Sequence, residues 1–198
     1  MKTFFFVLLL SLFMVSVAFG QSHYTVEKSS SKINWWGYKL FKTKATNHHG
    51  TMKFDKGQLL LDDKNQLKGA SFTANVNTLE CEDLKGDAKQ KNNLEKHLKS
   101  ADFFDTKKFP IAIFVLKHIA ASGNKRLPLK LTGDLTIKAI TKQIFFKAKN
   151  KLKGELLYFE SEKFTINRKN FKIEYEATYK DIIIKNDVDL KIKIIAKK

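Results

Sequence analysis

An alternation of apolar and polar residues with a period of two runs along most of this chain, and no other feature limits its fold as strongly. The alternation is clearest in residues 70–77, which read Ala-Ser-Phe-Thr-Ala-Asn-Val-Asn, and it returns in residues 129–137 and 188–194. Successive side chains of a β-strand point to opposite faces, so the pattern predicts strands with one dry and one wet face. We predict further strands at residues 32–38, 51–55, 58–62, 111–119, 143–149, 152–160, 162–168 and 173–184.

Short turn signals separate these segments, for example at residues 62–65 and 122–124. Many antiparallel strands with close turns imply a closed barrel or a sandwich, and the alternation alone allows both. Gly133 and Gly154 lie inside strand patterns, where glycine often marks the bulge or kink that lets a sheet curl. The residues therefore predict an all-β domain of one of these two architectures.

One segment breaks the alternation. Residues 84–100 are rich in charge, with Leu94 and Leu98 at helical spacing, and predict a single short amphipathic helix that begins near Asp87 and ends before Asp102. Three phenylalanines and a proline follow, and the proline forces the residue before it into an extended conformation. We therefore expect a helix-to-strand transition that carries Phe103, Phe104 and Phe109.

The N-terminus has the layout of a secretory signal peptide. Lys2 precedes an unbroken apolar run at residues 4–19, and Gly20 follows that run. A retained membrane anchor is the alternative, although the run is shorter than the roughly 20 apolar residues that a spanning helix needs. We expect cleavage near Gly20, a periplasmic or secreted protein, and one folded domain at residues 21–198. No cysteine stands directly after the apolar run, since the only one is Cys81, so no lipid anchor is expected.

The chain is strongly basic, with a formal net charge of +17. Its lysines are spread along nearly every segment, arginine occurs only at positions 126 and 168, and export would take the protein away from nucleic acid. We therefore expect a solvated basic surface and no nucleic-acid partner, with weak attraction to anionic membrane surfaces as an intermediate possibility.

The residues that most often carry metal or catalytic chemistry are sparse. His48 and His49 are neighbours that would point to opposite faces of a strand, and no HxH, HxxxH or CxxC spacing occurs, so no metal site is expected. Cys81, the single cysteine, cannot form a disulfide within the chain, and we expect it to be a small buried residue. Cys81 could form a catalytic thiolate pair with His97, but the carboxylates beside Cys81 would raise the pKa of the thiol and so work against its nucleophilicity. Without a Gly-x-Ser-x-Gly elbow or a glycine-rich phosphate loop, we predict no enzyme, no catalytic residues and no cofactor.

Three segments carry a family resemblance. Residues 96–110 (KHLKSADFFDTKKFP), residues 131–142 (LTGDLTIKAITK) and, more weakly, residues 164–171 (FTINRKNF) resemble the successive signatures of the YceI-like family. The resemblance implies an extended eight-stranded antiparallel β-barrel, similar to lipocalins, with an internal tunnel for polyisoprenoid or other long-chain lipids and no established catalytic activity. Two stretches differ from the common family pattern: Lys169-Asn170, where an aspartate often follows the arginine, and residues 35–39. Family members can pair through barrel surfaces, so a homodimer stays open.

The phenylalanine content fits such an interior. Of 17 phenylalanines, five lie in the predicted signal peptide and twelve remain. Large rings beside small residues on the dry faces would leave a channel, whereas the alternative is a solid core in which the side chains meet. We expect a tunnel wall formed by aromatic residues and a weaker set at a polar mouth, with the segment at Phe103 and Phe104 closing one end. The wall set is Trp35, Phe72, Phe103, Phe104, Phe109, Phe114 and Phe146, and the mouth set is Tyr38, His97 and Arg168.

The predicted function is binding, transport or storage of a long isoprenoid-type amphiphile, such as a polyprenyl chain or a quinone, outside the cytoplasm. The alternative is a solid-cored, basic extracellular interaction protein that binds anionic membrane or acidic polymers.

Overall fold

The computed structural model describes residues 21–42, 44–177 and 181–198, so the predicted signal peptide at residues 1–20 lies outside the described residues. Within the described residues the chain forms ten β-strands, one α-helix and one short 3-10 helix, η1. The elements are β1 (Ser22–Val26), β2 (Lys32–Phe41), β3 (Lys44–Leu61), β4 (Leu67–Cys81), α1 (Ala88–Lys99), β5 (Ile111–Ala121), β6 (Leu129–Ile137), β7 (Ile140–Lys153), β8 (Leu156–Ser161), β9 (Phe164–Asn167), η1 (Arg168–Phe171) and β10 (Ile182–Lys197).

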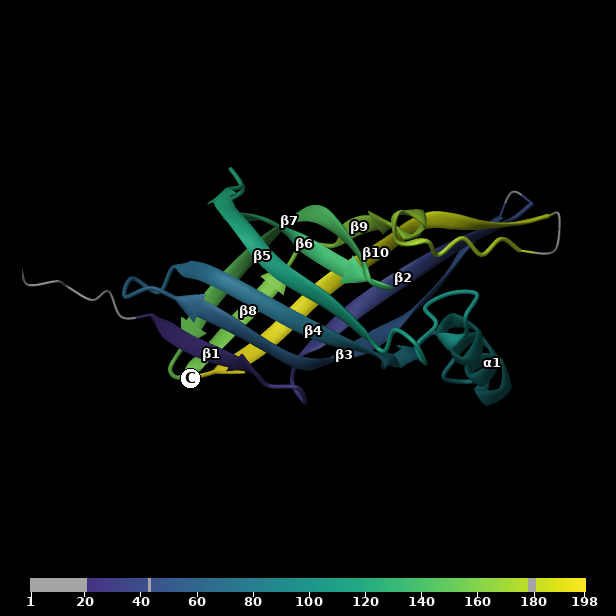
Figure 1. Cartoon of the computed structure of the whole chain (residues 1–198), viewed down its shortest axis with the longest axis horizontal. Coiled ribbons are helices and arrows are strands. Elements are labelled where there is room, and N and C mark those ends of the chain that lie inside the picture. Colours follow the sequence, from purple (N-terminus) through teal and green to yellow (C-terminus); the bar gives the residue numbers. More distant parts are fainter. Residues whose placement is uncertain (1–20, 43, 178–180) are drawn as a thin grey trace, which may run out of the picture.

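The strands close into an elongated antiparallel barrel (Figure 1). Each strand from β2 to β7 pairs with the next along the chain, and β10 pairs with both β8 and β2, which completes the ring. β1 and β2 both pair with β3 and with β10, and all four pairings are antiparallel. β8 and β9 both pair with β10. β1 and β2 therefore share one strand position of the barrel wall, which we call a stave, and β8 and β9 share another. The prediction of an eight-stranded barrel is therefore confirmed as eight staves, while the count of separate strands is ten because two staves are interrupted.

The predicted helix is confirmed. α1 begins after Asp87, whose side chain accepts a hydrogen bond of 2.9 Å from the backbone N–H of Gln90. Because that bond satisfies one of the free N–H groups of the first turn, Asp87 is a typical N-cap. The helix packs against one end of the barrel next to β4 (Figure 1), with Leu94 and Leu98 turned toward the interior.

Several strand boundaries differ from the prediction. The segments at 51–55 and 58–62 belong to one long strand, β3, whose register with β4 shifts at several bulges. The single strand predicted at 152–160 is wrong: the chain reverses there, and β7 and β8 form a hairpin. Gly154 has a φ of +58° and lies in the turn of this hairpin, so it is not a bulge inside a strand. A left-handed backbone is open to glycine at little cost, and this is what permits the tight turn.

The chain between β9 and β10 also departs from the alternation. The strand predicted at 162–168 ends at Asn167, because the Asn167 side chain accepts a hydrogen bond of 2.9 Å from the N–H of Lys169 and caps η1. Of the strand predicted at 173–184, only the last residues belong to β10, which begins at Ile182. The alternation of residues 173–177 therefore reflects partial burial without a ladder of backbone hydrogen bonds.

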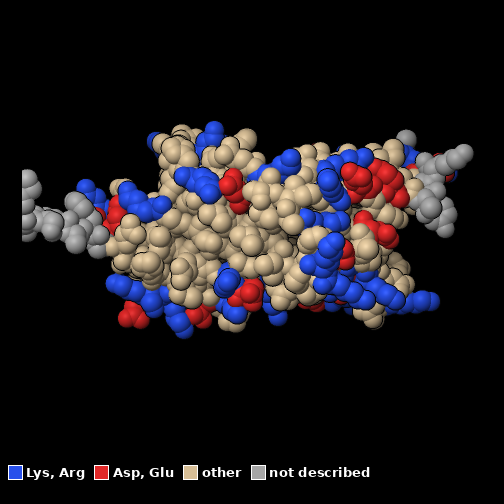
Figure 2. Space-filling model, viewed as in Figure 1, with Lys and Arg blue, Asp and Glu red and all other residues tan. Residues whose placement is uncertain are grey.

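Charged side chains are frequent on the outside of the barrel. Figure 2 shows Lys and Arg mainly along the upper and lower edges of the viewed face and toward its right, with Asp and Glu among them and uncharged residues between. Some form ion pairs across strands: Glu160 lies 2.8 Å from Lys191 and 3.2 Å from Lys149. The hydrogen bond from Lys191 is the main reason why the pKa of Glu160 lies below its ordinary value. Among the described residues, no helix combines the length and the apolar character that crossing a bilayer requires.

Gly133 confirms the expectation of an irregularity inside a strand. It lies in β6 opposite Leu116, at the point where the register between β5 and β6 shifts. A Cβ atom at this position would overlap the Phe114 ring and lie 2.6 Å from the carbonyl oxygen of Val115. We therefore expect Gly133→Ala to lower the free energy of unfolding by about 2 kcal/mol, the usual cost of overpacking a core. Urea denaturation is the measurement.

Gly86→Ala is the matched control for this variant. A Cβ atom at Gly86 meets nothing within 4 Å, so the free energy of unfolding should hardly change. Equal losses of stability in the two variants would contradict the steric explanation.

Candidate ligand-binding cavity

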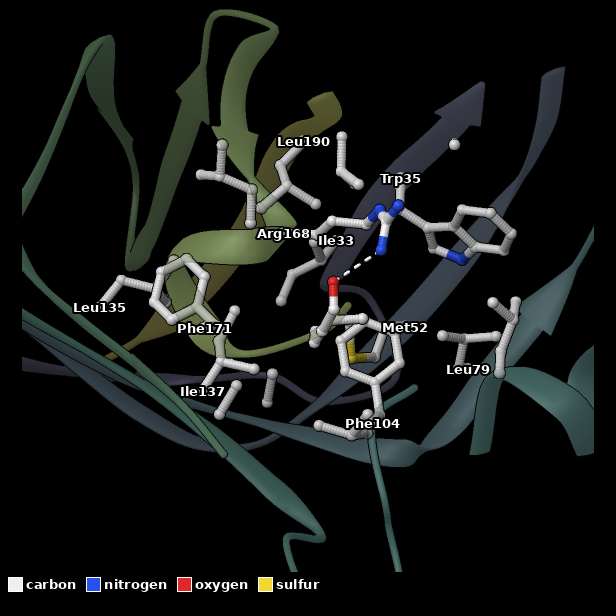
Figure 3. Close-up of a pocket in the computed structure, with 18 of the residues that line it drawn as sticks. Ile33, Trp35, Met52, Leu79, Phe104, Leu135, Ile137, Arg168, Phe171 and Leu190 are labelled. Atoms are coloured by element: carbon white, nitrogen blue, oxygen red, sulfur yellow. Dashed lines mark hydrogen bonds between the residues drawn. The ribbon is translucent and has the colours of Figure 1, made fainter. Parts of the chain in front are cut away.

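A cavity of about 200 Å³ occupies the interior of the barrel near α1. Its wall is almost entirely apolar and comes from strands on all sides of the barrel, together with α1 and the turn that follows it. Figure 3 shows apolar side chains facing one another across the space, with Leu135, Ile137 and Phe171 near one end and Trp35 and Leu79 near the other. The volume is more than ten times what one water molecule requires, so the space is large enough for part of an organic ligand.

Alternation in β4 and β5 explains why this space is open. Phe72 faces Phe114 across these two strands, and the two rings are stacked with their centroids 6.1 Å apart. One step along the same inward face, Ala74 lies opposite Ala112. Two methyl groups beside two phenyl rings leave open space on this part of the inward face, and all four residues line the cavity.

Most of the residues predicted for the wall line this cavity. They are Trp35, Phe72, Phe103, Phe104, Phe114 and Phe146. Phe109 does not: it is half-buried outside the lining, and Lys108 Nζ lies 5.3 Å from its ring centroid. The proline after Phe109 fixes an extended backbone, but the sequence does not show to which side the ring then turns.

Of the three residues predicted for a polar mouth, Tyr38 and Arg168 border the cavity and His97 does not. The hydroxyl of Tyr38, on the face of β2 opposite to Trp35, donates to Asp189 Oδ2 at 2.6 Å and accepts from Lys163 Nζ at 2.9 Å. The hydrogen bond to Tyr38 and the nearby Asp189 carboxylate raise the pKa of Lys163. His97 lies outside the cavity lining, with its ring centroid 4.6 Å from that of Tyr175 and 5.1 Å from that of Phe103.

Arg168 lines the cavity but is buried inside the protein. Its guanidinium donates to three backbone carbonyls: Nη1 to Ile173 at 2.6 Å, Nε to Lys185 at 3.2 Å and Nη2 to Ile184 at 3.3 Å. Its side chain is 4% exposed, and the nearest carboxylate, Glu176, is 3.8 Å away and more than half exposed. Figure 3 shows the guanidinium within the cavity, bonded to a carbonyl oxygen. Burial lowers the pKa of Arg168 from its ordinary value.

Three further basic residues border the cavity and were not predicted: Lys39, His48 and Lys185. Lys39 Nζ lies 3.2 Å from His48 Nε2, and His48 Nδ1 lies 2.7 Å from Asp83 Oδ2. The sequence does contain an indication for Lys39, because Lys39 follows Ile33 and Trp35 by an even number of positions and so lies on the same inward face of β2. Burial works to raise the pKa of Asp83, but the hydrogen bonds from His49 N–H and His48 outweigh it and lower the pKa.

Trp35 and Cys81 form a small cluster with Leu79 at the α1 end of the cavity. Cys81 is fully buried, as predicted, and burial together with Glu95 and Asp83 raises the pKa of its thiol to about 12. The thiol is therefore protonated at neutral pH and is a poor nucleophile. The indole Nε1 of Trp35 is buried and has no hydrogen-bond partner among the described residues.

Comparisons with known proteins agree with this architecture. The model of the YceI-like domain matches residues 24–196. Protein YceI of Escherichia coli O157:H7 is 30% identical over 141 residues, which make up 71% of this chain and 65% of that protein. The chain thus spans a little under two thirds of the length of this curated relative.

Solved structures show the same fold at lower identity. BcnA of Burkholderia cenocepacia is 21% identical and superposes with a TM-score of 0.65, over 87% of this chain and 99% of that chain. A domain from Saccharophagus degradans is 10% identical and has a TM-score of 0.58, over 88% of this chain and 97% of that chain. That domain is described as a polyisoprenoid binding domain implicated in plant cell wall breakdown.

Proposed function

Because the chain belongs to the YceI-like family, we propose that its barrel binds a long isoprenoid-type lipid, such as a polyprenyl chain or a quinone, in the internal cavity. The observation that carries this proposal is the cavity of about 200 Å³ with an almost wholly apolar wall. The description of the Saccharophagus degradans domain as polyisoprenoid-binding supports the same ligand class.

The chemistry of the wall suits a long apolar chain. Each buried CH₂ group contributes about 0.8 kcal/mol, so a flexible chain gains most of its affinity from area alone. Flat aromatic rings such as those of Phe72, Phe114 and Phe146 offer that area at little conformational cost. The wall of the cavity therefore favours an isoprenoid or acyl chain over a polar metabolite.

Native mass spectrometry of the protein purified after expression of the whole chain tests the proposal. We expect a second species that is heavier by the mass of one lipid and that reverts to the bare mass on collisional activation. The proposal is contradicted if the purified protein shows no added mass and also fails to bind a fluorescent polyene.

The place and role of the protein follow as part of the same proposal. If the apolar run at residues 4–19 acts as a signal peptide, the barrel carries or stores its lipid in the periplasm or outside the cell. A homodimer also stays a prediction. The outer face of the barrel carries exposed Ile111, Val115 and Phe145, which a second subunit could cover.

The high positive charge favours one competing function, in which the basic surface binds anionic membrane or acidic polymers. The dependence of the binding affinity on salt concentration distinguishes the two functions. Binding through exposed lysines should weaken steeply between low and physiological ionic strength, whereas an apolar chain inside the barrel should hardly respond.

A further inference from the structure

The polar part of the cavity wall carries charge of one sign. Lys39, His48, Arg168 and Lys185 border the cavity, and among the described residues of the lining there is no Asp or Glu. Three carboxylates lie behind the polar groups of the lining: Asp83 is bonded to the Nδ1 side of His48, Asp189 accepts from the hydroxyl of Tyr38, and Glu176 is more than half exposed beside Arg168.

These basic residues form one contiguous group, which we call the basic cluster. Lys39 on β2 lies directly opposite Ile184 on β10 in the strand pairing. Arg168 binds the carbonyl oxygens of Ile184 and of its neighbour Lys185. Lys39 also reaches His48 on β3. The basic cluster therefore spans β2, β3, η1 and β10 at a single place in the wall.

The basic cluster offers more N–H donors than the described residues of the protein accept. A lysine ammonium has three donors, and only one of those of Lys39 is directed at His48. A guanidinium has five donors, and backbone carbonyls accept from three of those of Arg168. Neither side chain can accept a hydrogen bond, so a ligand group placed here must bring acceptors, and a negative charge on them strengthens each bond.

We propose that the basic cluster selects lipids with an anionic, oxygen-rich head, a phosphate or a carboxylate, over the same chain with a neutral hydroxyl head. This selection rests on the lipid binding proposed above and narrows its ligand class. The apolar wall holds the chain, and the basic cluster holds the head. Because the surrounding wall is apolar, the attraction is less screened than on an open surface.

Two ligands that differ only in the head test this proposal. Geranylgeraniol and geranylgeranyl phosphate are titrated below their micelle concentrations, and binding is followed by the fluorescence of the tryptophans, one of which lines the cavity. We expect the phosphate to bind about tenfold more tightly, the effect of one or two charge-assisted hydrogen bonds that stay partly solvated. In Lys39→Met, which keeps the aliphatic stem, this ratio should fall to about threefold. Inorganic phosphate alone should not displace either lipid.

Lys44→Met is the matched control, because Lys44 lies on the same β2–β3 hairpin, is exposed and does not border the cavity. Its ratio of affinities should equal that of the parent protein. Equal affinities for the two ligands, an unchanged ratio in Lys39→Met, or displacement by inorganic phosphate would each overturn the selection. Failure of both ligands to bind would instead count against the proposed function itself.

Discussion

Replacing Arg168 with methionine is expected to lower the free energy of unfolding by about 3 kcal/mol, because one buried and two half-buried backbone carbonyls lose their hydrogen-bond donors. The Arg168 guanidinium ties the carbonyl of Ile173, after η1, to those of Ile184 and Lys185 at the start of β10. The register between β10 and β2 shifts immediately beyond Ile184, so these carbonyls lie where the ladder is irregular. Methionine fills much of the same volume, which leaves the loss of the donors as the main effect.

Urea denaturation followed by fluorescence measures this loss, and Arg126→Met is the control. Arg126 is the other arginine of the chain and is exposed in the loop between β5 and β6. We expect its replacement to change the free energy of unfolding by less than about 0.5 kcal/mol. Arg168→Lys should fall between the two, because a compact ammonium cannot reach three carbonyls in different directions. If Arg168→Met were as stable as the parent protein, water in the cavity would have to satisfy the carbonyls in place of the guanidinium.

The barrel could be predicted from the sequence, but the interruptions of two staves could not. Between β1 and β2, Ser31 Oγ donates to the carbonyl of Ile195 and accepts from the N–H of the same residue. At the end of β8, Ser161 Oγ accepts from the N–H of Ile192. In each case a buried serine replaces a missing rung of the ladder. Such a serine looks like any polar residue of an alternating strand, because its partner lies on β10, far along the chain.

For the cavity, too, the features that follow from strand alternation could be predicted, and those that depend on contacts far along the chain could not. Inward parity correctly indicated Phe72 and Phe114, because a strand fixes the face on which each side chain lies. The position of Arg168 depends on η1, which turns the chain after β9 and directs the guanidinium toward the start of β10. Asn167 caps this turn, but an asparagine at the end of an alternating strand does not show where the following arginine will point. Lys39 has inward parity, yet charge alone suggested that it was solvated.

Filling the space beside Ala74 provides the most direct test of where the lipid lies. Ala74 is 6% exposed, lines the cavity and faces Ala112, so a phenyl ring at this position would project into the cavity. We expect Ala74→Phe to weaken binding of geranylgeraniol by about 100-fold, since the ring occupies volume that the chain needs. The adduct in native mass spectra should disappear as well. Because the ring enters an existing space, the change in unfolding free energy should stay within about 1.5 kcal/mol.

Ser71→Phe separates occupation of the cavity from the mere addition of a ring. Ser71 lies on the same strand, three residues away, and faces the outside of the barrel. This variant should keep the affinity of the parent protein for geranylgeraniol. If near-UV circular dichroism shows that Ala74→Phe is folded and it still binds with the parent affinity, the lipid cannot lie between β4 and β5. Binding would then have to take place at another site on the protein.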